Sequence, residues 1–129
     1  MNELLGRPQQ VLVVAQDTRL AMSLVAWLRK CGCEPAVTTS YSAGRDQLEK
    51  GPAIVIAEVK LGAYNGLHLA LRARAKGIPA VVFGEANAAT EREARQVGAA
   101  YFNPLDLEKA ELQSLLRTAV TPSPDWRRA

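Results

Sequence analysis

Two acidic residues stand at the ends of apolar runs and are the side chains best placed to do chemistry. Asp17 follows the run 11–15 and Gln16, and Glu58 directly follows the run 53–57. If both runs form parallel strands of one sheet, their carboxyl ends meet at the edge where α/β proteins bind ligands. Carboxylates in such a place could hold Mg²⁺ or take part in phosphoryl transfer. Two carboxylates without a third ligand do not define a metal site, so we expect neither a metal nor another cofactor.

The other side chains of known chemical use predict no catalytic site. His68 falls on the exposed side of a predicted helix, and no Ser, Cys or second His is placed to work with it. Cys31 and Cys33 are too close in sequence for an unstrained disulfide, and we interpret Cys31 as a core residue. The phosphate-binding, nucleophile-elbow and CxxC motifs are absent from the sequence. We therefore expect no enzymatic activity.

Apolar runs alternate with segments of helical periodicity, a pattern typical of α/β folds. The predicted strands cover residues 11–15, 35–39, 53–58, 79–83 and 99–102. The predicted helices cover residues 20–31 up to a stop at Gly32, 40–50 with Ser40 or Ser42 as cap, 66–76 up to Gly77, 88–97, and 107–120 with Asp106 as cap. This order implies right-handed crossovers and a parallel sheet with helices on both faces.

Length, hydropathy and charge narrow the class of protein. A chain of 129 residues, 48% of them apolar, suits one domain with one sizeable core. Its apolar stretches are short, so we expect no membrane span and no secretory leader, and a cytoplasmic location. The formal net charge of +3 is spread over the chain without any run of three basic residues. This distribution does not predict a nucleic-acid partner.

Three stretches of the chain resemble the receiver domain of two-component response regulators. They are VLVVAQDTRL at the first strand, AEVKLGAYNGLHL at the third strand and its following loop, and VGAAYFNPLDLEK before the last helix. The resemblance covers about residues 10–120 and implies a flavodoxin-like, doubly wound, five-stranded parallel sheet of order 2-1-3-4-5. We expect residues 1–9 to form an N-terminal extension and residues 121–129 an irregular C-terminal tail.

The positions that carry phosphoryl chemistry in that family hold other residues here. The resemblance places Ala15 and Gln16 where two acids bind Mg²⁺, and Glu58 where an Asp accepts the phosphoryl group. It places Gly84 where a Thr or Ser would contact that group, and Asn103 where a Lys would. A longer acceptor side chain without metal, hydroxyl or ammonium should be inert, because such transfer depends on placement and charge. The chain therefore resembles a degenerate receiver, or pseudo-receiver.

Three functions remain open for such a chain. The leading hypothesis is a phosphorylation-independent protein–protein interaction module of a two-component-like signalling pathway. One alternative is a small-ligand sensor or degenerate enzyme that uses the pocket at the carboxyl ends of the strands. Another is an atypical response regulator that is still phosphorylated on Glu58 or Asp17.

Glu58 has two interpretations of its own. It is either a structural carboxylate, hydrogen-bonded to neighbouring backbone amides, or a mimic of a phosphorylated Asp. We expect no functional mimicry, because the hydroxyl and ammonium partners of a phosphoryl group are missing.

An interaction module needs a contact surface, and the first predicted helix offers a candidate. Met22 and Val25, followed by Arg29, are predicted on a flank that would ordinarily be polar. They form either a contact surface for a signalling protein or a second copy of the chain, or scattered surface apolar residues. Tyr101 and Phe102 are both candidates for the family's switch aromatic, and a core role is open for either.

Overall fold

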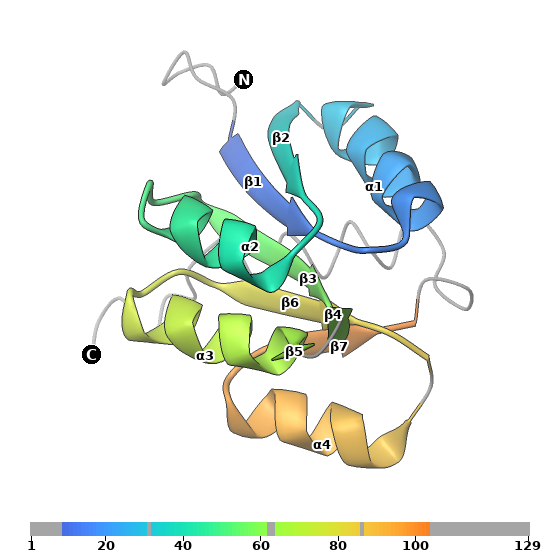
Figure 1. Ribbon diagram of the computed structural model, residues 1–129, viewed down its shortest axis with the longest axis vertical. Coiled ribbons are helices and arrows are strands. Elements are labelled where there is room, and N and C mark those ends of the chain that lie inside the picture. Colours follow the sequence, from blue (N-terminus) through green and yellow to red (C-terminus); the bar gives the residue numbers. More distant parts are fainter. Residues whose placement is uncertain (1–8, 31, 62–63, 86, 104–129) are drawn as a thin grey trace.

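The predicted apolar runs form a five-stranded parallel sheet. The computed structural model describes residues 9–30, 32–61, 64–85 and 87–103. The strands of the sheet are β1 (Gln9–Val14), β2 (Cys33–Thr38), β3 (Ile54–Glu58), β6 (Ala80–Phe83) and β7 (Ala100–Phe102). They lie in the order β2-β1-β3-β6-β7, and every neighbouring pair is parallel (Figure 1). Counted along the chain within this sheet, this is the order 2-1-3-4-5, so the predicted fold class is confirmed.

Helices cover both faces of the sheet. In the described part of the chain they are α1 (Thr18–Lys30), α2 (Tyr41–Leu48), α3 (Gly66–Ala75) and α4 (Ala88–Gln96). α1 packs on one face, and α2, α3 and α4 cover the other (Figure 1). Within the described ranges, no helix is long and apolar enough to cross a membrane. The predicted helix 107–120 with Asp106, the tail 121–129, residues 1–8 and Cys31 lie outside the described residues.

Local polar side chains and glycines set the helix ends. Ser40, Asn65 and Asn87 each accept a backbone N–H of the helix that follows, at 3.2, 2.8 and 3.0 Å. Such caps each stabilise a helix by about 1 kcal/mol. Gly32 and Gly77 adopt positive φ angles of 83° and 74° just after α1 and α3, as the predicted helix ends require. Of the two predicted caps of α2, Ser40 is the one in use.

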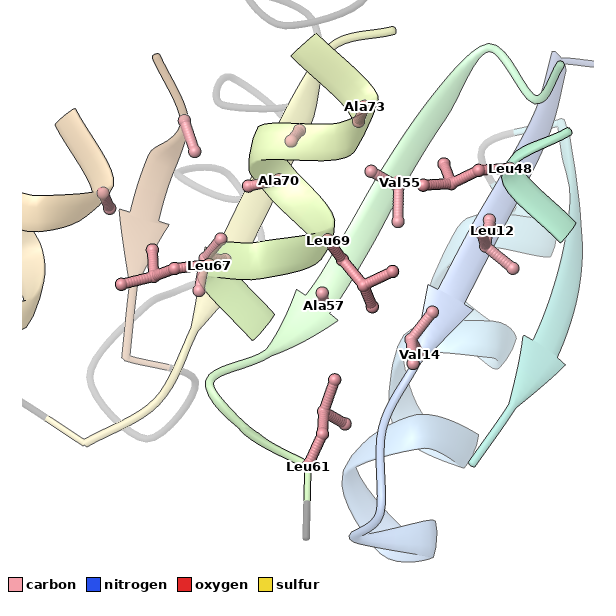
Figure 2. Close-up of a cluster of buried hydrophobic side chains, with 14 residues drawn as sticks. Leu12, Val14, Leu48, Val55, Ala57, Leu61, Leu67, Leu69, Ala70 and Ala73 are labelled. Atoms are coloured by element: carbon pink, nitrogen blue, oxygen red, sulfur yellow. The ribbon is translucent and has the colours of Figure 1, made fainter. Parts of the chain in front are cut away.

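Alternating side chains of the central strands build the core on both faces of the sheet. Leu12 and Val14 of β1 pack toward α2 and α3, whereas Val11 and Val13 pack toward α1. Figure 2 shows the first of these clusters, in which Leu69 of α3 points toward the side chains of β1. Each fully buried aliphatic side chain contributes roughly 1.5–3 kcal/mol, and a one-residue slip would turn these residues to the wrong face. The core therefore fixes the strand register that aligns the carboxyl ends.

The connection between β3 and α3 contains a small hairpin where the sequence predicted a loop. Its strands β4 (Lys60–Leu61) and β5 (Tyr64–Asn65) pair antiparallel. The amide of Gly66 donates to the carbonyl of Val59 at 2.7 Å, and a Cβ at position 66 would collide with the main-chain oxygen of Glu58. Only glycine fits this close approach of α3 to the end of β3.

The structure corrects the prediction for the flank of α1. Val25 is 4% exposed, so the prediction that it lies on an exposed flank is wrong. The buried face of α1 extends further around the helix than the predicted stripe and includes this flank. Met22 is 60% exposed, and Arg29 is exposed as predicted.

Candidate site at the carboxyl ends of the strands

Parallel strands bring the predicted site residues to one edge of the sheet. Ala15 follows β1 with its side chain fully buried, and Glu58 is the last residue of β3. Gly84 and Asn103 follow β6 and β7, which are neighbours in the sheet. The amide of Gly84 donates to the carbonyl of Phe102 at 3.1 Å. The register therefore gathers these positions at one edge, as the sequence predicted.

The carboxylate of Glu58 binds the main chain that follows β1. Its Oε1 accepts the amide of Gln16 at 2.8 Å and the amide of Asp17 at 3.2 Å. These amides precede α1, where the helix dipole also favours a negative charge. The extra methylene of Glu58, relative to Asp, is what gives the side chain this reach. These hydrogen bonds to neighbouring backbone amides are those expected from the structural interpretation of Glu58.

The carboxylate of Asp17 is also committed to the main chain. Its Oδ1 accepts the amides of Arg19 and Leu20 at 3.0 and 3.3 Å. Asp17 is therefore the N-cap of α1, and this satisfies backbone donors that the helix leaves unpaired. Asp17 lies one residue beyond positions 15 and 16, where the metal-binding acids were expected, and its carboxylate caps α1.

The residues at this edge do not fit the Mg²⁺ site of an active receiver. Ala15 supplies no ligand and Gln16 has a neutral side chain. One oxygen each of Asp17 and Glu58 is already bound to backbone amides. Within the described residues, no group of three His, Cys, Asp or Glu side chains could hold a metal ion. A small hard cation that requires several charged oxygen ligands is poorly served by this set.

Tyr101 occupies the space beside Gly84. Its hydroxyl donates to the carbonyl of Glu85 at 2.6 Å. A Cβ at position 84 would lie 2.9 Å from that hydroxyl oxygen and 3.3 Å from a methyl of Val59. Burial raises the pKa of the Tyr101 phenol, and the charges of Glu91 and Glu85 raise it further. The missing side chain at position 84 is thus replaced in space by the phenol of Tyr101.

The two candidate switch aromatics have different environments. Phe102 is 4% exposed, and its ring stacks on Phe83 at a centroid distance of 5.5 Å and an angle of 27°. It is a core residue on the α1 face of the sheet. Tyr101 packs on the other side, at the edge of the candidate site. Of the two, Tyr101 is therefore the aromatic that contacts the site.

A cluster on α2 and α3 was not singled out from the sequence. His68 is exposed, as predicted, and its ring lies edge-on to Tyr41 at a centroid distance of 6.4 Å. The Nε of Arg72 donates to the Tyr41 hydroxyl at 3.0 Å, and Leu71 beside it is 51% exposed. The spacing of His68, Leu71 and Arg72 places them on one face of α3, a signal that the sequence contains. Tyr41 belongs to α2, so the cluster itself depends on tertiary packing.

A pocket of about 170 Å³ lies near the amino ends of strands β1 and β2, away from the carboxyl ends that carry the candidate site. It is lined by Gln10, Val11, Leu12, Glu34, Pro35, Ala36, Gln47, Lys50 and Pro52. These residues belong to the early parts of β1 and β2, the end of α2 and the start of the segment that leads to β3. None of the predicted site residues lines this pocket.

Comparisons with known proteins identify the fold. No family model matches the sequence. No curated protein matches it either. A protein from Chloroflexus aurantiacus J-10-fl, assigned as a response regulator, is 24% identical with a TM-score of 0.82, over 90% of this chain and 100% of that one. The BeF3-activated receiver domain of RstA from Klebsiella pneumoniae is 18% identical with a TM-score of 0.80, over 88% and 100% of the two chains.

A third similar structure holds a magnesium ion. The receiver domain of the sensor histidine kinase PA1611 from Pseudomonas aeruginosa PAO1 has a magnesium ion in its active site cleft. It is 19% identical with a TM-score of 0.78, over 89% of this chain and 99% of that one. At these identities, the likeness establishes that the chain has the receiver fold.

Proposed function

We propose that the chain is a phosphorylation-independent protein-interaction module of a two-component-like signalling pathway. It would work in the cytoplasm, with a signalling protein or a second copy of the chain as its partner. The receiver fold supports the link to such pathways. The residues at the carboxyl ends of the strands favour a role without phosphoryl transfer.

The hydrogen bonds of Glu58 are the observation that carries this proposal. At the acceptor position, its Oε1 is held by the amides of Gln16 and Asp17 at 2.8 and 3.2 Å. Both bonds go to Oε1, so an attack on phosphorus would fall to Oε2. Ala15, Gln16 and Asn103 supply neither a metal-binding acid nor a lysine ammonium to stabilise the developing charge. We therefore assign Glu58 to the architecture of the loop after β1.

The contact between Tyr101 and Gly84 supports the same conclusion. The phenol lies where a side chain at position 84 would extend, and it binds the carbonyl of Glu85. Contacts at this edge that need no added group suit a module that binds its partner constitutively.

The two alternatives have less support. A sensor or degenerate enzyme at the strand ends would bind its ligand through this edge, where the carboxylates of Asp17 and Glu58 already accept backbone amides. An atypical response regulator phosphorylated on Glu58 or Asp17 would have to use the second oxygen of a carboxylate whose first oxygen accepts backbone amides, without the acids and the lysine that assist the transfer in receivers.

Incubation with acetyl phosphate and Mg²⁺, followed by intact-mass measurement, tests the proposal. We expect no added phosphate on this chain. A receiver domain with a complete acidic pocket, treated in parallel, must become labelled for the result to count. A phosphate adduct that maps to Glu58 or Asp17 would contradict the proposal and favour the atypical response regulator.

A further inference from the structure

The outer surface of α2 and α3 combines an exposed aliphatic side chain with an oriented arginine. We call Tyr41, His68, Leu71 and Arg72 the α2–α3 patch. The two helices lie side by side on the same face of the sheet (Figure 1). The patch is on a different face of the molecule from Met22 of α1, so it is independent of the surface predicted from the sequence.

Arg72 is held in place by its neighbour on α2. Its Nε donates to the Tyr41 hydroxyl at 3.0 Å. The ring of His68 packs edge-on against the ring of Tyr41, at 6.4 Å and 88°. A guanidinium has five N–H donors, and this bond uses one of them. The remaining donors have the fork geometry that suits a carboxylate, and part of the ordering cost has been met before any partner binds.

Leu71 supplies the apolar part of the patch. It is 51% exposed, and the other large hydrophobic residues with high exposure in the described part of the chain are Met22 and Val37. Leu71 is three residues after His68 and directly precedes Arg72, so the three lie on one face of α3. An exposed leucine alone needs no explanation. A leucine beside an oriented guanidinium and an aromatic pair provides both parts of a small contact site.

The electrostatic surroundings favour a negative partner. α3 contains Arg72 and Arg74 but no acidic residue. The carboxylate of Glu49 binds the ammonium of Lys76 at 2.8 Å; this hydrogen bond is the main cause of the lowered pKa of the Glu49 carboxyl, and the charge of Arg72 lowers it further. Among the described residues, no carboxylate lies within 4.0 Å of the Arg72 guanidinium. Arg72 therefore makes no direct ion pair with a described residue, and its guanidinium can bind a carboxylate from outside the chain.

We propose that the α2–α3 patch docks an amphipathic acidic helix of a partner protein, with a carboxylate on Arg72 and an aliphatic side chain on Leu71. The proposal rests on the interaction function proposed above and specifies a surface and a partner chemistry for it. A nucleic acid fits less well, because its continuous phosphates require several cations, whereas Arg72 is the one Lys or Arg residue of the α2–α3 patch. A helix can place a single carboxylate opposite Arg72.

The experiment uses a fluorescein-labelled synthetic helical peptide with Leu and Glu residues along one face. Fluorescence polarisation gives its Kd for the full chain, and amide chemical-shift changes in the ¹⁵N-labelled chain locate the site. We expect Arg72→Glu to weaken binding at least about tenfold, or about 1.4 kcal/mol. Leu71→Ser should weaken it as well. Arg92→Glu is the matched control, because it makes the same charge change at an exposed residue of α4 and should bind like the parent.

The outcomes separate the acidic helix from other occupants. Absence of binding at millimolar peptide, unchanged binding by a folded Arg72→Glu variant, or shifts centred on α1 would each overturn the proposal. Equal binding of a peptide with Lys in place of Glu would overturn the charge argument. Concentration-dependent sedimentation that is lost in Arg72→Glu would assign the patch to a second copy instead. All of these results are independent of the phosphate-uptake test, so the two proposals can fail separately.

Discussion

Replacement of Glu58 by Asp tests the structural role of this carboxylate directly. The change restores the type of acceptor that the resemblance to receivers implies, but shortens the side chain by one C–C bond of about 1.5 Å. The two distances from Oε1 to backbone amides are 2.8 and 3.2 Å. Withdrawal of the carboxylate by that length takes it beyond hydrogen-bond range of both amides. We therefore expect both bonds to be lost.

The size of the effect follows from the exposure of the site. Hydrogen bonds to charged groups contribute about 1.5–3 kcal/mol each, but Gln16 and Asp17 are exposed, so water can replace the lost acceptor. We expect a total loss of about 1–2 kcal/mol and a fall in Tm of roughly 3–8 °C. Glu58→Gln keeps an oxygen acceptor at full reach without the charge and should lose less, about 1 kcal/mol. Its affinity for a partner should change by less than about tenfold.

Urea denaturation and thermal melting of the parent, Glu58→Gln and Glu58→Asp provide the assay. The expected order of stability is parent, then Gln, then Asp. The Asp variant should still take no phosphate from acetyl phosphate with Mg²⁺, because Ala15, Gln16, Gly84 and Asn103 are unchanged. An Asp variant as stable as the parent would refute the role of the two hydrogen bonds. Phosphorylation of that variant would show that the acceptor was the single missing group.

Four further predictions concern the neighbouring features. Gly84→Ala should lower the free energy of unfolding, measured by urea denaturation, by about 1–3 kcal/mol, because the new Cβ would lie 2.9 Å from the Tyr101 hydroxyl. A smaller loss in a Tyr101→Phe background would confirm this contact, and an equal loss would exclude it. Because the pKa of Tyr101 is raised in the folded chain, the unfolded chain loses this phenolic proton at a lower pH than the folded chain does. The free energy of unfolding should therefore fall as pH rises above about 10, and the fall should be shallower in Tyr101→Phe. The Tm should be the same with millimolar Mg²⁺ and with EDTA; an upward shift with Mg²⁺ would reveal a metal site. Met22→Asp should leave the Tm nearly unchanged. Val25→Asp should prevent stable folding, because it buries a charge at a residue that is 4% exposed. Thermal melts followed by circular dichroism distinguish the two outcomes.

The sequence was sufficient to predict the order of the elements and the edge of the sheet where they converge. Parallel strands between two layers of helices have no face toward solvent, so they are apolar on both faces. The sequence shows this directly as continuous apolar runs. Ser40, Gly32 and Gly77 act on backbone groups within a few residues, so the helix ends they set are local properties. The strand order and the convergence of positions 15, 58, 84 and 103 follow from the resemblance to receivers. All of these features depend on short-range patterns or on a common topology.

Tertiary structure decided the contacts between groups that are distant in sequence. Glu58 finds its amide partners 42 and 41 residues away, and the sequence left that structural role open beside phosphate mimicry. Tyr101 rather than Phe102 lies at the site because alternate residues of β7 face opposite sides of the sheet, which the sequence alone could not orient. Val25 was misplaced because helical periodicity gives the centre of a buried face, while its width depends on what packs around the helix. Side-chain partners in three dimensions are set by packing over the whole domain, and a pattern read along the chain carries no information about their distances.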